Sequence, residues 1–446
     1  DDSSSSVTCP AELPVVIYQH GISTHRGTLL ALADALAGTC AIGVAIDLPK
    51  HGILPNDPDF GSLSLKTSER LIRPASDDTN DCQNPDDAQD TGSEVYCAPG
   101  DYYVNLENLP NAQATIRQSV TDLHSLYRSI SSTNLETALS NSGYSRGVDT
   151  SNVHYVGISL GAIVGAPFVA QESGIKTVSL NVGGGGIAKI LDGSPSLEPT
   201  VRQGLAANGV VKPSSDYEGF LLIAQTMLDN TDPMNFTDEV NAAEDSVAYW
   251  LNAAPSSGSQ RAVLYQEVVG ESQRIDADCS SVACPDQVVP NNVYGQTGLT
   301  EAWRPSTTYS NQFSFLPNQN PNTSFVALAG TDPLTQGTAF LAQAGQGLFD
   351  PVPPAGMRSP NLFYGLTLQQ VDSSGVSAGT SLNSGLVRFS AGGHSSLLDR
   401  SINSNTTTVM QTQVAIFIGS YLKSGGATTK IAADPNEGTS DQVVVD

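Results

Sequence analysis

Basic residues are scarce in this sequence. Lys and Arg total 20 against 45 Asp and Glu, which gives a formal net charge of -25 at pH 7. Nucleic acids and anionic membrane surfaces are held mainly by clustered positive charge, so a chain with this balance is a poor candidate for binding either. We therefore expect no nucleic-acid partner and no membrane surface held by charge.

Several other features are missing. No apolar run approaches the roughly 20 residues of a membrane-spanning helix, so no transmembrane segment is expected. The cysteines form no C-x-x-C pair and lack the spacing of a zinc site. Four glycines at 183–186 follow an apolar run, but the G-K-[ST] of a phosphate-binding loop is absent. We interpret these glycines as a flexible strand exit, and we expect no metal and no cofactor.

The six cysteines fall into three locally spaced pairs: Cys9/Cys40, Cys82/Cys97 and Cys279/Cys284. An even count is typical of an oxidising compartment, and six free buried thiols are the alternative. Both members of the first pair precede apolar runs, so neighbouring strands would bring them together. The chain begins Asp-Asp-Ser-Ser-Ser-Ser without Met. We expect a secreted or cell-surface protein from which a signal or lipid anchor has been removed.

The rest of the sequence alternates apolar runs with amphipathic segments. Runs that predict strands lie at 13–18, 41–48, 153–156, 177–182, 262–269, 325–329 and 386–390. Helical spacing marks 27–38, 111–130 and 409–422. This alternation predicts an α/β fold, with a mostly parallel central sheet flanked by helices. The 446 residues fit one large domain with insertions, which we place at 1–446.

Two segments interrupt this alternation. Residues 53–110 are rich in Asp, Asn, Pro and Ser, and we interpret them as an acidic surface insertion stapled by a disulfide. The insertion lacks the EF-hand calcium pattern, so a solvated acidic loop is favoured over a calcium site. Residues 187–260 carry helical patterns between two strands and predict a cap or lid. The apolar residues at 220–223, 227 and 228 fit either the protein core or an acyl pocket.

A five-residue motif, Gly157-Ile158-Ser159-Leu160-Gly161, follows the apolar run at 153–156. G-x-S-x-G between a strand and a helix is the pattern of a nucleophile elbow. Side chains on either side of such a sharp turn would clash, and glycine avoids the clash. Ser159 is therefore the candidate nucleophile, and an ordinary Gly/Ser turn is the alternative. Pro167 predicts that the following helix is short or kinked.

A serine hydroxyl needs a base within hydrogen-bond reach, and that base needs an orienting carboxylate. In α/β-hydrolases the chain order is Ser, acid, His. His394 is the only histidine after Ser159, and it lies on a Gly-flanked loop after the last predicted strand. Two acids obey the order: Asp286 after the run at 262–269, and Asp332 after the run at 325–329. We favour Asp286, and a turn aspartate is the alternative for either.

Acyl transfer also needs two backbone N–H groups that stabilise the oxyanion. The residue after the nucleophile supplies one, which is Leu160 here. The loop after the first predicted strand supplies the other, and His20-Gly21 allows a tight turn there. We assign this second donor to Ile22, and we expect His20 itself to be structural.

Taken together, these residues resemble bacterial extracellular lipases of the α/β-hydrolase superfamily, in particular the family that includes surface-exposed lysophospholipases. The similar stretches lie at 18–22, 108–123, 156–165, 264–270, 286–291, 328–334 and 388–399. In that family the stretch Leu-Ala-Gly-Thr-Asp-Pro-Leu at 328–334 looks structural, which supports Asp286 over Asp332. The elbow departs from the family at Ile158, where such lipases usually have His, and this difference concerns the substrate more than the mechanism.

The sequence thus predicts a secreted serine carboxylic-ester hydrolase, a lipase or esterase that acts on a small-molecule or lipid ester through an acyl-enzyme. A phospholipase and a cutinase-like polyester depolymerase are alternatives within ester hydrolysis. A peptidase could use the same triad. An alternative of another class is a non-catalytic α/β-hydrolase binding module, against which the complete Ser–acid–His order argues. Nothing in the sequence indicates the oligomeric state.

Overall fold

The computed structural model describes residues 8–236 except 66–68, 77, 84, 93 and 133, then 261–271, 283–289 and 370–445 except 378, 380 and 381. Some sequence predictions fall outside these ranges: the strand at 325–329, the part of the predicted cap after residue 236, Asp332 and Cys279.

A seven-stranded sheet forms the centre of the protein, in the order β2-β1-β5-β6-β7-β9-β8. Each pairing between neighbours in it is parallel. Its strands are β1 (Glu12–Gln19), β2 (Ile42–Ala45), β5 (Gly147–Ile158), β6 (Ile175–Asn181), β7 (Ala262–Val268), β8 (Gln370–Val371) and β9 (Gly385–Phe389). Strands β7 and β9 are buried along their whole length, as expected for a sheet covered on both faces. The predicted parallel α/β architecture is confirmed.

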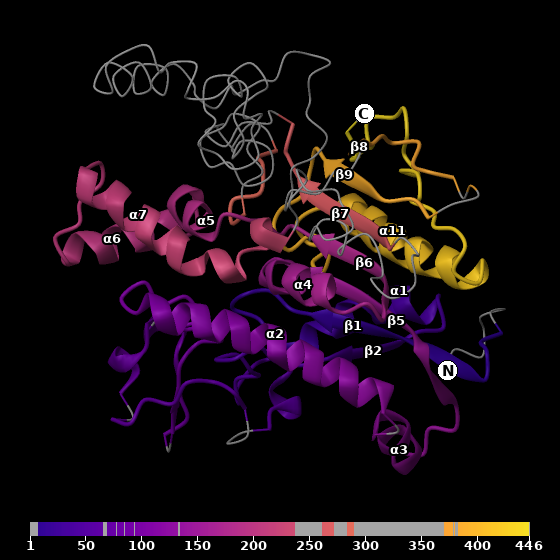
Figure 1. The fold of residues 1–446 in the computed structure, drawn as a ribbon, viewed down its shortest axis with the longest axis horizontal. Helices are drawn as coiled ribbons and strands as arrows, with labels where there is room; N and C mark the ends of the chain where they lie inside the picture. The colour runs from indigo at the N-terminus through magenta and orange to yellow at the C-terminus, as the bar shows by residue number, and fades with distance from the viewer. Residues whose placement is uncertain are drawn as a thin grey trace.

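Helices cover both faces of this sheet, and each face has its own apolar cluster (Figure 1). Helices α2 (Leu109–Ser131) and α4 (Leu160–Gln171) contribute to one cluster. The short α1 (Ala33–Ala37) and the long α11 (Ser404–Lys423) contribute to the other. The small helix α3 (Asn134–Asn141) follows α2. None of the described helices is long and apolar enough to cross a membrane.

Helix α2 shows why the sequence forms this layer. Asn108 caps it by accepting a hydrogen bond from the N–H of Asn111, and a proline occupies its first turn. Ile116, Leu123 and Ile130 recur at helical spacing and are buried against the sheet. Burying each such side chain contributes about 2 kcal/mol, which outweighs any intrinsic helix preference of this segment.

The helix expected at 27–38 is instead a 3-10 helix, η1 (Arg26–Leu32), followed by α1. Contacts to the sheet fix its first turn: the backbone N–H of Arg26 donates to Asp47 at 2.7 Å, and the Tyr18 hydroxyl lies 2.9 Å from the Thr28 hydroxyl. Tertiary contacts of this kind override periodicity in so short a segment.

Residues between β2 and α2 form no long element. They contain the 3-10 turns η2 (Gly61–Leu63), η4 (Thr79–Asp81) and η5 (Pro85–Asp87), and a hairpin of β3 (Gln89–Asp90) and β4 (Val95–Tyr96). A small cluster of Cys82, Val95 and Cys97 is buried beneath them. This is the stretch expected to be an acidic insertion, and its status as a separate insertion remains a prediction.

After β6 the chain forms α5 (Ile187–Gly193), α6 (Glu198–Ala207) and α7 (Ser215–Leu228), then η6 (Asp229–Thr231) and η7 (Pro233–Phe236). Figure 1 shows α5–α7 grouped together beside α4. On α7, Leu221 and Leu228 are buried, whereas Leu222 is 70% and Ile223 59% exposed. The apolar stripe expected there is thus divided between core and surface, and the cap over 187–260 remains a prediction.

Two of the expected disulfides are present. Cys9 and Cys40 are joined just before β1 and β2, at the amino ends of neighbouring parallel strands. Cys82 and Cys97 are joined within the segment between β2 and α2. Cys284 is also disulfide-bonded. Its expected partner, Cys279, lies outside the described residues.

Candidate active site

The strand order places a switch point between β1 and β5. From β1 the chain moves outward to β2, then returns to the other side of β1 with β5. Ligands of open parallel sheets bind in the crevice beyond the strand ends at such a point. Gln19 at the end of β1 pairs with Gly157 at the end of β5, so the loops that follow these two strands lie side by side.

Ser159 lies beyond these strand ends, on the sharp turn between β5 and α4. Its backbone has φ 54° and ψ -120°, a left-handed conformation that L-residues rarely adopt. A Cβ at Gly157 would lie 2.5 Å from the carbonyl oxygen of Gly161, and a Cβ at Gly161 would lie 2.1 Å from that of Gln19. Neither position accepts a side chain, so both glycines of the motif are required by this turn.

His394 follows β9 and reaches Ser159 from the far end of the chain. Its Nε2 lies 2.7 Å from Ser159 Oγ. Gly392, with φ 114°, turns the chain before it, and the N–H of Gly393 donates to Ser396 Oγ at 2.8 Å. The imidazole is 19% exposed, so solvent reaches one side of it. These contacts fix the imidazole beside the serine hydroxyl.

Asp286 follows β7 and holds the other ring nitrogen. Its Oδ2 lies 2.6 Å from His394 Nδ1, and its side chain is 1% exposed. The other oxygen, Oδ1, accepts hydrogen bonds from the N–H groups of Val288 at 2.8 Å and Val289 at 3.2 Å. Because the carboxylate accepts the Nδ1 proton, Nε2 presents a lone pair to Ser159. Asp332, the alternative acid, lies outside the described residues.

The loop after β1 packs against Ser159, the candidate nucleophile. A Cβ at Gly21 would lie 3.1 Å from the Cβ of Ser159. The Gly21 carbonyl accepts hydrogen bonds from His20 Nδ1 at 2.7 Å and Thr24 Oγ1 at 2.9 Å. In a planar trans peptide the next N–H, that of Ile22, points the opposite way from this carbonyl. These two bonds therefore set the direction of the predicted Ile22 donor.

The second predicted donor, Leu160, is the first residue of α4. The first N–H groups of a helix have no partner within the helix, and they carry its partial positive charge. This is the position that an oxyanion donor requires, directly after the nucleophile. The roles of Ile22 and Leu160 as donors remain predictions.

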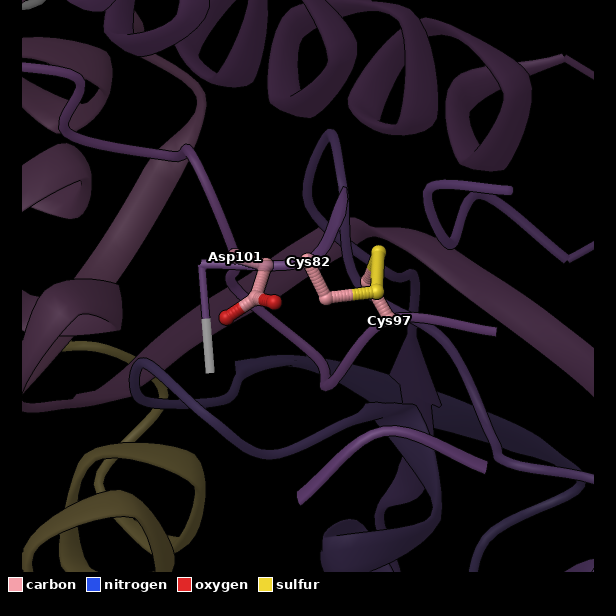
Figure 2. Close-up of side chains that lie close together, drawn as sticks. All are labelled: Cys82, Cys97 and Asp101. Atoms are coloured by element: carbon pink, nitrogen blue, oxygen red, sulfur yellow. A yellow bond between two sulfur atoms is a disulfide. The ribbon is translucent and has the colours of Figure 1, made fainter. Parts of the chain in front are cut away.

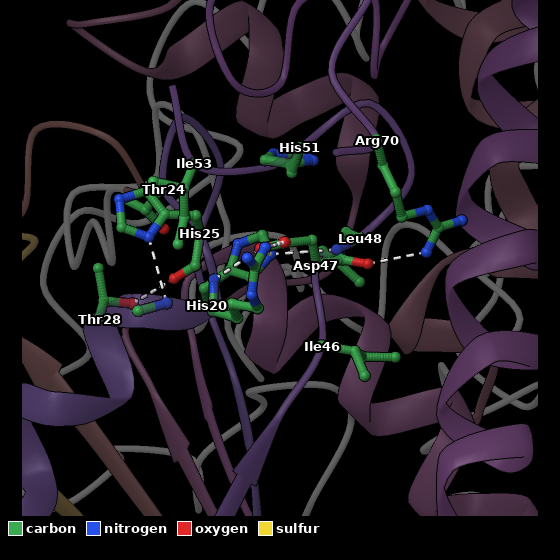
Figure 3. A network of polar contacts seen from close by, with 12 residues as sticks. His20, Thr24, His25, Thr28, Ile46, Asp47, Leu48, His51, Ile53 and Arg70 are labelled. Atoms are coloured by element: carbon green, nitrogen blue, oxygen red, sulfur yellow. Dashed lines mark hydrogen bonds and ion pairs between the residues drawn. The ribbon is translucent and has the colours of Figure 1, made fainter. Parts of the chain in front are cut away.

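Figure 3 shows a buried polar network behind this loop. His20 Nδ1 donates to Gly21, so its Nε2 is the acceptor for the N–H of Leu48 at 3.1 Å. The ring of His51 packs against that of His20 with a tilt of 52° and 4.9 Å between centroids, and its Nδ1 donates to the carbonyl of Pro49 at 2.8 Å. Sequence reasoning gave His20 a structural role but did not single out His51. Its position directly after the second apolar run, at the same sheet edge as Ser159, was the available signal.

Acid is expected to destabilise the protein through three buried histidines. Burial lowers the pKa of His20, His51 and His154 to about 3 each. The unfolded chain binds these protons near pH 6.5, so the free energy of unfolding falls from there towards pH 3, by about 1 kcal/mol per pH unit for each histidine. Urea unfolding at several pH values between 7 and 5 measures this slope. The H154N variant should reduce this slope by the contribution of one histidine. A slope equal to the wild type's would contradict the lowered pKa of His154.

Only one group of potential metal ligands occurs among the described residues: Cys82, Cys97 and Asp101. Figure 2 shows that the two sulfurs are bonded to each other. A disulfide offers no thiolate, so this group does not fit a metal ion. No cluster of carboxylates of this kind occurs in the described parts of residues 53–110.

The four glycines after β6 are not a free loop. The carboxylate of Asp232 accepts hydrogen bonds from the N–H groups of Gly186 at 2.9 Å and Ile187 at 2.7 Å. Gly186 is left-handed, with φ 76°, and caps α5. A carboxylate of the protein thus accepts the two N–H groups at the end of the glycine stretch, and the flexibility expected for the stretch remains a prediction.

No protein-family model matches the sequence, and no curated protein matches it. Several solved structures do. The acetyl xylan esterase from Paenibacillus sp. R4 has 15% identity and a TM-score of 0.32, covering 59% of this chain and 61% of that one. Acetyl xylan esterase 1 from Thermoanaerobacterium sp. JW/SL YS485 has 14% identity and a TM-score of 0.29, covering 64% and 63%. An esterase from Exiguobacterium antarcticum has 9% identity and a TM-score of 0.24, covering 63% and 77%.

The chain spans less than two thirds of the length of the two acetyl xylan esterases, at 61% and 63%. Because these identities and TM-scores are low, the fold is assigned from the protein's own sheet and site. The strands are parallel, the sharp turn follows β5, and the acid and the imidazole follow β7 and β9 in that chain order. With this order of elements and side chains, the protein has an α/β-hydrolase fold.

Proposed function

We propose that this protein is a serine carboxylic-ester hydrolase. The observation that carries the proposal is the continuous hydrogen-bonded chain from Ser159 through His394 to Asp286, with 2.7 Å and 2.6 Å between the bonded atoms. Three residues far apart in sequence meet at the carboxyl edge of one sheet, in the arrangement that activates a serine hydroxyl. A turn serine or a packed histidine would not require this convergence.

In the proposed reaction, Ser159 Oγ attacks the ester carbonyl carbon while His394 Nε2 takes the hydroxyl proton. The carbonyl electrons move onto oxygen, and the N–H groups of Ile22 and Leu160 stabilise that charge. The intermediate collapses, the C–O bond to the alcohol breaks, and His394 gives its proton to the departing oxygen. Water then attacks the acyl-enzyme by the same route, which releases the carboxylic acid and restores Ser159. Asp286 keeps His394 in the required tautomer throughout.

The substrate is proposed to be a small-molecule or lipid ester, with lipase, phospholipase and polyester depolymerase as the finer possibilities. The disulfides Cys9–Cys40 and Cys82–Cys97 support a secreted or cell-surface location, because such bonds persist in oxidising compartments.

A serine-directed phosphonate tests the reaction class. One adduct per chain is expected, and mass spectrometry of the digested protein should assign it to Ser159. An excess of a hydrolysable ester should slow labelling by competing for the same serine. A folded protein that remains unlabelled and does not hydrolyse esters would contradict the proposed function.

A chain-length series then defines the substrate. Turnover of p-nitrophenyl esters with short to long acyl chains separates an esterase from a lipase, and release of acid from polyester film identifies a depolymerase. A lysophospholipid assay distinguishes the phospholipase alternative.

A further inference from the structure

We propose that the turn at residues 97–103, held by the Cys82–Cys97 disulfide, positions the loop that carries the Ile22 N–H and thereby sets the rate of the chemical step. We call it the Gly100 turn. The inference rests on the proposed function, because Ile22 matters in this way only if an oxyanion forms. It gives the segment between β2 and α2 a role beyond that of a solvated surface loop.

The backbone of the Gly100 turn lies directly on the loop after β1. Gly100 is left-handed, with φ 91°. A Cβ at this position would lie 3.0 Å from Ile22 Cγ1, 3.1 Å from the Ser23 nitrogen and 2.9 Å from His51 Nε2. Even a methyl group at this position would force Ile22, Ser23 or His51 to shift, so the positions of the turn and the loop are coupled.

His51 joins the two. Its Nε2 is buried, has no hydrogen-bond partner among the described residues, and faces Gly100. Its ring packs edge to face with that of Tyr103 at 5.3 Å between ring centroids, and it also lies tilted against the ring of His20. His20 in turn bonds the carbonyl of Gly21, whose peptide bears the Ile22 N–H. Packing therefore runs without a break from the turn to the donor.

The turn is also anchored to the body of the protein. The N–H of Gly100 donates to the carbonyl of Lys50 at 2.8 Å. The Tyr103 hydroxyl lies 2.6 Å from Ser119 Oγ on α2, and the tyrosine is fully buried. These contacts fix the end of the turn nearest α2.

The disulfide fixes the opposite end. Residues on both sides of Cys82 bond Tyr102: its N–H donates to Gln83 Oε1 at 2.7 Å, and its hydroxyl donates to the Asp81 carbonyl at 3.0 Å. Both sulfurs are buried, in a cluster of only three buried apolar residues. So small a cluster provides little stability of its own, and the covalent bond therefore holds Cys97, where the turn begins, against the chain at Cys82.

The expected kinetic signature follows from where the oxyanion donor acts. A donor aimed at the developing charge stabilises the transition state far more than the bound ester. Loss of alignment should therefore lower kcat and leave KM nearly unchanged. A residue that only supports overall stability would lower the amount of folded enzyme without changing kcat per competent site.

The test compares two glycine variants. G100A places a Cβ against Ile22, whereas G92A lies in the β3–β4 hairpin with φ 79° and no atom within 4 Å of its Cβ. Both share the cost of a left-handed alanine, so only the contact differs. When rates are expressed per phosphonate-labelled Ser159, G100A should lower kcat by about 10- to 100-fold. The upper figure approaches the loss in kcat that follows removal of one oxyanion donor. KM should stay near the wild-type value, and G92A should match the wild type in both.

A second pair of variants covers the case in which G100A does not fold. C82S/C97S removes the disulfide of the turn, and C9S/C40S removes the one at the amino ends of β1 and β2. The first should lower kcat per labelled serine and the second should not. Equal effects on kcat from both cysteine pairs, or a folded G100A with wild-type kcat, would overturn the inference. The proposed function would still stand in that case, provided that the wild-type enzyme is active. Inactive, unlabelled wild-type protein instead rejects the proposed function.

Discussion

S159A is expected to lower kcat for ester hydrolysis by about a millionfold, because the nucleophile cannot be replaced by any neighbour and triad members act as a unit. The residual rate should come from substrate binding and the oxyanion donors. Alanine keeps the Cβ of serine, so the backbone strain at φ 54° is the same in both proteins. The midpoint of thermal unfolding should therefore change little.

The matched control is S151A, on the same strand β5. Ser151 is exposed, and its hydroxyl bonds only the nearby Asp149 among the contacts of the described residues. Turnover of p-nitrophenyl esters by this control should equal that of the wild type. A folded S159A enzyme within tenfold of wild-type kcat would show that another group performs the attack.

D286N should lower kcat by about ten-thousandfold through the wrong histidine tautomer. Oδ1 of Asp286 accepts two backbone N–H groups, from Val288 and Val289. The amide oxygen of an asparagine would take that place, which turns its NH2 group towards His394 Nδ1. Nδ1 must then accept, so Nε2 carries the proton and cannot receive another from Ser159. The pH-rate profile and kcat measure the effect.

Asp434 offers a closely matched control. It is 2% exposed, and its Oδ2 accepts N–H bonds from Val443 at 2.7 Å and Val444 at 3.0 Å, without contact to the triad. D434N should thus lower the free energy of unfolding by about as much as D286N does, and it should leave kcat per folded molecule unchanged. If D332N rather than D286N abolished turnover, the choice of acid would be wrong.

The sequence predicted much of the fold because its signals are local. Uninterrupted apolar runs specify buried parallel strands, and the spacing of Ile116, Leu123 and Ile130 specifies one face of α2. Chain order alone identified His394, since no other histidine follows Ser159. The structure brings that imidazole to within 2.7 Å of the serine hydroxyl.

Other features could not be predicted because they depend on contacts between distant residues. Nothing in the sequence near Gly100 indicates that its backbone lies against Ile22, because that contact requires the whole segment between β2 and α2 to fold back over the sheet edge. Similarly, the glycines at 183–186 suggested a loose strand exit. A carboxylate 46 residues further along the chain binds the last of them, Gly186, instead.

That carboxylate has a wider consequence. By bonding the N–H of Gly186, Asp232 brings together the two ends of an excursion that contains α5, α6 and α7. Residues inside the excursion also contact the rest of the protein: the Ser194 hydroxyl and the Ser196 N–H both donate to the carbonyl of Gln287, next to Asp286. Exposed positions of this excursion, such as Leu222 and Ile223, can therefore vary during evolution without loss of either attachment.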